Sequence, residues 1–228
     1  MGIISLEHRS NLYWLGRYAE RVYTTMDSFF DYYDLMLDGD KNSYKEFLEK
    51  LSIADKYGDC QSFIQGYLYG ADDFSINSTL RRAHDNALVI KSMIGSDSLA
   101  YIDLAANVFH SNRDAKTLRL ALMPVADYLL AFWGCIDDKL ANVEARNIIK
   151  CGKLVERLDL YFRLSRDHAL INSEYEKLCH IIVRMRKGIC NTQQLPVLVE
   201  VLAIENSYKE RLDEVLYCLN KLFEELAY

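Results

Sequence analysis

The sequence predicts an all-α fold, and three observations support this class. Proline and glycine are scarce, at 2 and 10 of 228 residues. No segment alternates apolar and polar residues over the length of a strand. The stretch 212–226 instead repeats apolar residues every three or four positions, as one helix face does. We therefore expect a single compact bundle of about eight to ten helices, forming one domain over residues 1–228.

Polar capping residues and glycines divide the N-terminal half into helices. Ser5 can cap a long first helix, and Asp59 can cap a short one. Ser43 and Glu46 have the spacing of a capping box, in which two side chains satisfy the free amides at a helix start. Gly95 is expected to end a helix. The expected helices cover about residues 6–37, 44–57, 60–70, 76–94 and 97–110.

The C-terminal half divides in the same way. Pro124 is expected to kink the helix that contains it, because proline lacks an amide hydrogen. Ser173 with Glu176, and Ser207 with Glu210, repeat the capping-box spacing. We expect helices from Asp114 to about 140, from Asn142 to about 170, from Ser173 to about 190, over about 196–204, and from Ser207 onward.

Composition and charge exclude several classes of protein. The net charge is −6, and no basic stripe interleaves with aromatic residues, so we expect no nucleic-acid partner. Arg119, Pro124 and Asp127 interrupt the apolar run 118–136, which favours a buried core helix over a membrane span. The first residues lack the pattern of a signal peptide, and the six cysteines include no Cys-x-x-Cys pair. We therefore expect a cytoplasmic protein with free thiols and no membrane partner.

A short phrase occurs twice in the chain. Residues 16–21 read GRYAER and residues 152–157 read GKLVER, and each copy falls within a long expected helix. A glycine inside a helix destabilises it by about 1 kcal/mol relative to alanine. A glycine repeated in the same phrase therefore indicates that each copy makes room for a close neighbour. We expect the two long helices to cross at Gly16 and Gly152.

The charged residues of this phrase have two interpretations. If the helices cross at their glycines, Glu20 faces Arg157 and Glu156 faces Arg21. In the first interpretation these are internal ion pairs that fix the packing of the helices. In the second they line a polar pocket, where the arginines hold a carboxylate or phosphate. A glutamate of that pocket, Glu20 or Glu156, would then hold an amine or act as a catalytic acid or base.

Two other polar groups are also candidates. Arg82 and Asn86 share a helix face, and they either bond to another helix or face solvent. Asp27, Asp31 and Asp34 have the spacing of a magnesium and diphosphate site, but a solvated helix face explains them more simply. No histidine has ligand spacing with cysteine, and no glycine-rich phosphate loop occurs. We therefore expect no metal and no cofactor.

The segment NLYWLGRYAERV, residues 11–22, resembles the opening signature of the alpha-E proteins, a family of bacterial all-helical proteins named for a Glu-Arg motif. The signature residues here are Asn11, Tyr13, Trp14, Gly16, Arg17, Glu20 and Arg21. The second Glu-Arg segment of the family matches residues 152–157, and its middle segment matches Arg82 and Asn86. In order, these matches span about residues 11–157.

The chain departs from the family pattern at three places. Arg146 stands where a tryptophan is usual, and Lys153 stands where an arginine is usual. The C-terminal portion of the family, which contains a histidine segment, has no evident match in residues 172–228. Any function of the family that depends on this last portion is therefore not carried over to the chain.

The resemblance implies a helical fold, a binding cluster and a class of partner. The expected binding cluster is Asn11, Arg17, Glu20, Arg21, Arg82, Asn86, Lys153, Glu156 and Arg157. Family members tend to be encoded beside, or fused to, ATP-grasp-type ligases and transglutaminase-like peptidases. We therefore expect an accessory or interaction protein that acts with such an enzyme in forming or modifying peptide bonds. The alternative is an enzyme whose Glu-Arg cluster acts on an amino-acyl or phosphorylated substrate, and a homo-oligomer is compatible with either.

Overall fold

The computed structural model describes residues 4–113 and 117–226. These residues form ten α-helices, three short 3₁₀ helices and no strand, so the all-α fold expected from the sequence is confirmed. The α-helices are α1 (Leu6–Leu37), α2 (Ser43–Lys50), α3 (Cys60–Tyr69), α4 (Ile76–Val89), α5 (Lys91–Ser111), α6 (Leu118–Lys139), α7 (Val143–Arg163), α8 (His168–Ile182), α9 (Leu195–Leu202) and α10 (Leu212–Lys221). The 3₁₀ helices are η1 (Thr192–Gln194), η2 (Ser207–Lys209) and η3 (Glu224–Leu226).

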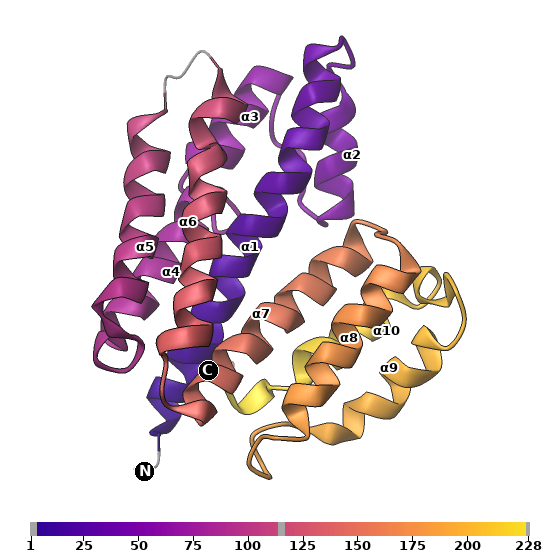
Figure 1. Ribbon diagram of the computed structural model, residues 1–228. Helices are drawn as coiled ribbons and strands as arrows, with labels where there is room; N and C mark the ends of the chain where they lie inside the picture. The colour runs from indigo at the N-terminus through magenta and orange to yellow at the C-terminus, as the bar shows by residue number, and fades with distance from the viewer. Residues whose placement is uncertain (1–3, 114–116, 227–228) are drawn as a thin grey trace.

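The longest helix, α1, runs through the middle of the molecule (Figure 1). Helix α7 packs across it and α4 packs along it, while α5 and α6 form an antiparallel pair on one side. Helices α8 and α10 pack against α7, and α9 packs against α10. The last turn, η3, contacts α1 again. Residues from both ends of the chain therefore meet near the crossing of α1 and α7.

Three of the expected helix starts are confirmed by their capping bonds. The hydroxyl oxygen of Ser5 accepts a hydrogen bond from the amide of His8 at 3.2 Å. Asp59 Oδ1 accepts from the amide of Ser62 at 2.8 Å. Asn142 caps α7 by accepting from the amide of Ala145, three residues into the helix, at 3.2 Å. Each cap satisfies an amide that has no partner inside its helix.

The three expected capping boxes are wrong. At α2 the preceding residue, Asn42, occupies the cap position without a side-chain bond, and Ser43 lies inside the helix. Helix α8 begins earlier than expected, because the carboxylate of Asp167 accepts the amides of Ala169 and Leu170. The start expected at Ser207 is a 3₁₀ turn. In each case the Ser-x-x-Glu pattern is present in the sequence, but the serine is not the capping residue of the helix.

Several helix ends also differ from expectation. Helices α2 and α7 end early, at Lys50 and Arg163, because Ser52 and Ser165 adopt the left-handed backbone conformation with φ of +57° and +52°. The helix expected over about 76–94 ends earlier, at Val89, and Gly95 interrupts the backbone inside α5 instead, with φ of +82°. The cap expected at Asp114 lies outside the described residues. Pro124 lies within α6.

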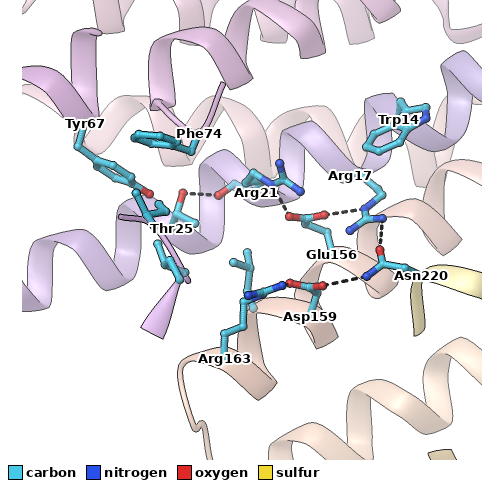
Figure 2. A pocket seen from close by; sticks show the side chains of 13 residues that line it. Trp14, Arg17, Arg21, Thr25, Tyr67, Phe74, Glu156, Asp159, Arg163 and Asn220 are labelled. Atoms are coloured by element: carbon cyan, nitrogen blue, oxygen red, sulfur yellow. Dashed lines mark hydrogen bonds and ion pairs between the residues drawn. The ribbon is translucent and has the colours of Figure 1, made fainter. Parts of the chain in front are cut away.

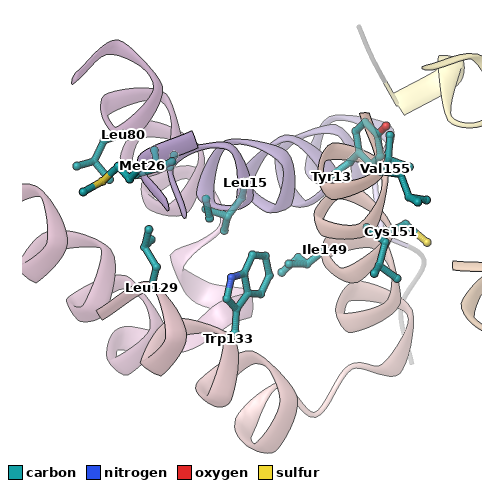
Figure 3. Close-up of a cluster of buried hydrophobic side chains, with 14 of the residues drawn as sticks. Tyr13, Leu15, Met26, Leu80, Leu129, Trp133, Ile149, Cys151 and Val155 are labelled. Carbon is teal, nitrogen blue, oxygen red and sulfur yellow. The ribbon is translucent and has the colours of Figure 1, made fainter. Parts of the chain in front are cut away.

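One continuous cluster of buried apolar side chains fills the space between the helices. Figure 3 shows Leu15 of α1 facing Leu129 and Trp133 of α6, with Ile149 of α7 beside them. The apolar run 118–136 thus contributes one face of α6 to this core, while Leu120 on its other face is exposed. Among the described residues, α6 is the one helix that is long and apolar enough to cross a membrane. The two buried charged residues of α1, Arg17 and Glu20, pair with residues of α7.

Candidate functional site

The two glycines of the repeated phrase lie at the crossing of α1 and α7. A Cβ atom added to Gly16 would overlap the carbonyl oxygen of Ile149 and lie 3.0 Å from the amide nitrogen of Lys153. A Cβ added to Gly152 would overlap the carbonyl oxygen of Tyr13. Each glycine therefore lets the backbone of the other helix approach to contact. The expected close crossing at the two glycines is confirmed.

The glutamates of the phrase pair with the arginines of the opposite helix. Arg157 Nε donates a hydrogen bond to Glu20 Oε1 at 2.6 Å. Arg21 Nε in turn donates to Glu156 Oε1. This is the exchange of partners that the repeated spacing predicted. Since each bond joins α1 to α7, the ion pairs hold the crossing together from both sides.

Glu156 accepts a second arginine as well. Arg17 Nε donates to Glu156 Oε2 at 2.6 Å, so each carboxylate oxygen of Glu156 has a guanidinium partner. The residue is only 1% exposed. Burial by itself raises the pKa of Glu156, but the charges and hydrogen bonds of Arg21 and Arg17 outweigh it and lower the pKa to about 2. Glu156 is therefore deprotonated and negatively charged at neutral pH.

Glu20 lies in a different environment. Its Oε1 accepts from Arg157 and, at 2.9 Å, from the hydroxyl of Thr24. Its Oε2 is buried and has no hydrogen-bond partner, although the residue is 0% exposed. Burial raises the pKa of Glu20 above its ordinary value, and the charge of Arg157 opposes this rise only in part. Each glutamate of the repeat thus pairs with an arginine of the opposite helix, but the charged form is stabilised more strongly at Glu156 than at Glu20.

Lys153 occupies the position in α7 that Arg17 occupies in α1. Its amino group lies 4.1 Å from the centroid of the Trp133 ring, a cation–π contact. Burial lowers the pKa of Lys153 to about 8, and the attraction of Glu20 does not compensate for it. Lys153 makes no ion pair at salt-bridge distance within the described part of the chain. Among the described residues, Glu20 therefore lacks a second cationic partner of the kind that Arg17 provides for Glu156.

A cleft of about 330 Å³ opens beside Glu156. Figure 2 shows its polar end, where Arg17, Arg21 and Glu156 lie close to Asp159 and Asn220. The complete lining is Trp14, Arg17, Arg21, Thr25, Leu51, Ile53, Tyr67, Phe74, Glu156, Asp159, Leu160, Arg163 and Asn220. This volume is at the lower end of the range for small-molecule sites. Glu20 does not line the cleft.

Three polar residues of this cleft were not predicted from the sequence. Asp159 Oδ1 accepts from Arg163 Nε at 2.7 Å, and Asp159 Oδ2 accepts from Asn220 Nδ2 at 3.3 Å. Asn220 Oδ1 also accepts from Arg17 Nη1 at 2.7 Å. Asp159 and Arg163 could have been found, since they follow Glu156 by three and seven residues on one helix face. Asn220 comes from α10 and had no comparable sequence signal.

Three residues of the expected binding cluster lie elsewhere. The side-chain nitrogen Nδ2 of Asn11 donates to the backbone carbonyl of Glu7 in its own helix, at 2.8 Å. Arg82 pairs with Asp73, and Asn86 donates to the carbonyl of Arg82 at 2.8 Å. The hydrogen bond from Asn86 to another helix, one of the two alternatives for this pair, is therefore wrong. None of the three lines the cleft.

The aspartates Asp27, Asp31 and Asp34 are paired with arginines. Arg166 Nη2 lies 3.4 Å from Asp27 Oδ2 and 3.9 Å from Asp31 Oδ2. Asp34, further along α1, pairs with Arg119 instead. Residues 4–113 and 117–226 contain no group of three potential ligands that could hold a metal ion. These carboxylates belong to exposed ion pairs at the end of α1 away from the cleft.

Comparison with known protein families gives a match to Alpha-E, described as a predicted alpha-helical domain with a conserved ER motif. The match covers residues 8–220 and so extends beyond the motifs at 11–157 into the part of the chain that supplies Asn220. No curated protein and no solved structure matches the chain. The matched range contains both Glu-Arg pairs that cross between α1 and α7, and the match covers far more than half of the sequence. The chain therefore belongs to the Alpha-E family.

Proposed function

We propose that this chain is an accessory protein that binds a substrate in the cleft beside Glu156 and acts with a peptide-ligating or peptide-processing enzyme. The proposal rests on one observation, namely that Arg17, Arg21 and Glu156 of the Glu-Arg cluster line the cleft. Arg17 and Arg21 offer donors to it, whereas Glu156, the glutamate of the cluster that lines it, is bonded on both oxygens. Such a site is suited to holding a ligand rather than to moving protons.

Arg21 is the main binding group in this proposal. Its Nε is bonded to Glu156, and its two terminal nitrogens have no protein acceptor within the described residues. Its side chain is 30% exposed and lines the cleft. Because the ion pair with Glu156 fixes the guanidinium, its terminal nitrogens are preorganised for an anionic ligand.

The alternative, an enzyme with Glu20 or Glu156 as acid or base, is less consistent with these positions. A general base works best when its pKa lies near the operating pH. The pKa of Glu156 is about 2, and both of its oxygens are bonded to arginines. Glu20 has the higher pKa, but it is fully buried and lies outside the cleft. Neither carboxylate is placed to exchange a proton with a ligand there.

The class of partner rests on the family resemblance. Family members tend to be encoded beside ATP-grasp-type ligases and transglutaminase-like peptidases, and both kinds of enzyme act on peptide or isopeptide bonds. We extend this association to the present chain and place its action in the cytoplasm. In this proposal the partner supplies the reaction, and the cleft presents the substrate to it.

The test is a reaction reconstituted from the chain and a ligase or peptidase of this class from the same organism. The chain alone should show no turnover, and its addition should raise kcat/KM of the enzyme for a peptide substrate. Arg21→Gln should reduce this increase by roughly tenfold or more, because a charge-assisted bond contributes about 1.5–3 kcal/mol. Arg119→Gln, which removes an exposed ion pair outside the cleft, is the matched control and should leave it unchanged.

Two results would contradict the accessory role. One is turnover by the chain alone. The other is a folded Glu156→Gln variant that stops the reaction while Arg21→Gln leaves it intact. Size-exclusion chromatography of each variant with the enzyme separates loss of complex formation from loss of substrate presentation.

A further inference from the structure

We propose that the ligand of this cleft is a monocarboxylate with an apolar or aromatic body, and specifically the C-terminus of a peptide that ends in an apolar residue. This proposal rests on the binding role given above and names the substrate class of the same cleft. Three properties of the lining carry it: its charge balance, the occupancy of its acceptors, and the separation of its polar and apolar ends.

The cleft has one positive charge more than it has negative charges. Arg17, Arg21 and Arg163 line it, and they face only two carboxylates, Glu156 and Asp159. The chain as a whole has a net charge of −6, so this local excess of positive charge runs against the overall balance. A partly buried charge is most stable when one opposite charge matches it. A ligand with a single negative charge therefore fits better than a phosphate, which carries close to two at neutral pH.

The unmatched donors have the geometry of a carboxylate site. All three arginines bond to the protein carboxylates through Nε, which leaves the edge formed by the two terminal nitrogens for other partners. Arg17 and Arg163 each use Nη1 as well, on Asn220 and Ser52. Arg21 lines the cleft, neither of its terminal nitrogens has an acceptor among the described residues, and Figure 2 shows it between Phe74 and Arg17. A guanidinium edge of this kind binds a carboxylate through two parallel hydrogen bonds.

Each carboxylate oxygen of the cleft already accepts a hydrogen bond, which disfavours a free amino acid as the ligand. Both oxygens of Glu156 accept from arginines, and those of Asp159 accept from Arg163 and Asn220. An ammonium group next to the bound carboxylate would find no unpaired acidic acceptor among them. A peptide C-terminus has an amide nitrogen at that position and avoids this loss.

The rest of the lining is apolar or aromatic. Leu51 and Ile53 follow α2, Tyr67 lies on α3, and Phe74 lies in the loop before α4. Trp14 lines the cleft near Arg17, with the guanidinium carbon 5.3 Å from the centroid of its ring. These side chains can bury an apolar side chain while Arg21 holds the carboxylate beside it. The volume of about 330 Å³ limits the buried part of the ligand to one or two residues.

The test uses Trp14 as a fluorescent reporter of the cleft. The sequence has two tryptophans, and Trp133→Phe leaves Trp14 as the only one. This variant is titrated with N-acetyl-phenylalanine, N-acetyl-phenylalaninamide, free phenylalanine and inorganic phosphate. We expect saturable binding of N-acetyl-phenylalanine and at least tenfold weaker binding of the other three. Isothermal titration calorimetry on the unsubstituted protein repeats the series, so the result does not depend on how well the variant folds.

Arg21→Gln should weaken the binding of N-acetyl-phenylalanine at least tenfold, and Arg119→Gln should leave it unchanged. The circular dichroism spectrum of each variant should match that of the parent protein, which shows that the variant is folded. The proposal is overturned if the amide or phosphate binds as tightly as the carboxylate, or if no ligand saturates at millimolar concentration. If binding fails while Arg21→Gln still removes the stimulation of the partner enzyme, the ligand class is wrong and the accessory role remains. If binding succeeds and that stimulation does not depend on Arg21, the accessory role is wrong and the ligand class remains.

Discussion

Glu156 and Glu20 occupy equivalent positions in two copies of one phrase, yet they differ in charge stability. Glu156 has a guanidinium on each oxygen and a pKa of about 2. Glu20 has one guanidinium, an unpaired buried oxygen and a raised pKa. The difference follows from one residue in each copy, since Arg17 reaches Glu156 whereas Lys153 lies over Trp133. A repeated motif can thus keep its crossing geometry while only one of its two glutamates, Glu156, lines a cleft.

The largest expected effect is the loss of the Glu156 carboxylate. Glu156→Gln leaves the buried guanidinium of Arg17 and the partly buried one of Arg21 without a charged partner and should lower the free energy of unfolding by about 3–5 kcal/mol. Glu20→Gln is the matched variant and should lower it by only about 1 kcal/mol, because its Oε2 has no bond to lose and Arg157 also contacts Glu174 at 3.3 Å. Urea unfolding at neutral pH measures both. Equal losses would show that the two centres are equivalent.

Protonation of Glu156 at low pH should lower the free energy of unfolding by nearly as much as Glu156→Gln does. Its pKa is lowered from 4.5 to about 2 on folding, so its contribution is complete above about pH 4.5 and is lost as the pH falls through about 2. The difference corresponds to about 3 kcal/mol. Glu20 has a raised pKa, so its contribution is present below its unfolded value and declines as the pH rises through its folded value.

Unfolding curves recorded between about pH 2 and pH 7 check this prediction. The difference in stability between the parent protein and Glu156→Gln should shrink as the pH falls. A difference that stays constant over this range would mean that Glu156 is not the group responsible.

A smaller loss is expected from closing the space at the helix crossing, which both centres share. Gly152→Ala places a Cβ against the carbonyl group of Tyr13, so the helices must separate, at about 2 kcal/mol of stability. Gly134→Ala on α6 is the control, because Gly134 is exposed and has nothing near its added Cβ. That variant should gain up to about 1 kcal/mol from helix propensity. Thermal unfolding of the two variants should therefore shift in opposite directions.

The smallest expected effect is a gain that would make the two centres alike. Lys153→Arg gives α7 the residue that Arg17 provides in α1, and its guanidinium should donate to the unpaired Oε2 of Glu20. We expect a stabilisation of about 1 kcal/mol, since an unsatisfied buried acceptor is removed. Lys150→Arg on the same helix is the control. It replaces one cationic partner of the exposed Asp137 with another and should not change the stability. A loss of stability in Lys153→Arg would show that the contact with Trp133 contributes more than the missing bond.

The sequence predicted the crossing and its exchanged ion pairs because both depend on spacing within helices. Gly16, Glu20 and Arg21 lie within two turns, and the same order recurs from Gly152, so the facing residues follow from helix geometry. Capping boxes were less predictable. The Ser-x-x-Glu pattern at Ser173 lies inside α8, because Asp167 had already capped that helix.

The cleft itself could be predicted only in part. Asp159 and Arg163 continue the helix face of Glu156 and were within reach of the same spacing argument. Leu51, Phe74 and Asn220 come from three other segments, and their positions depend on how those segments pack against α1 and α7. Tertiary contacts of this kind leave no periodic pattern in a single sequence.

The bond between Asn220 and Arg17 joins the tenth helix to the first across 203 residues of chain. During synthesis, Arg17 emerges from the ribosome first, and Asn220 follows 203 residues later. Glu156 can neutralise the arginines before α10 exists, but the wall that Asn220 provides cannot form until then. A fragment that ends before α10 would keep the helix crossing and lack a complete cleft. A complete cleft is therefore a property of a chain that extends through α10, and a ligand of the cleft would distinguish such a chain from one truncated before that helix.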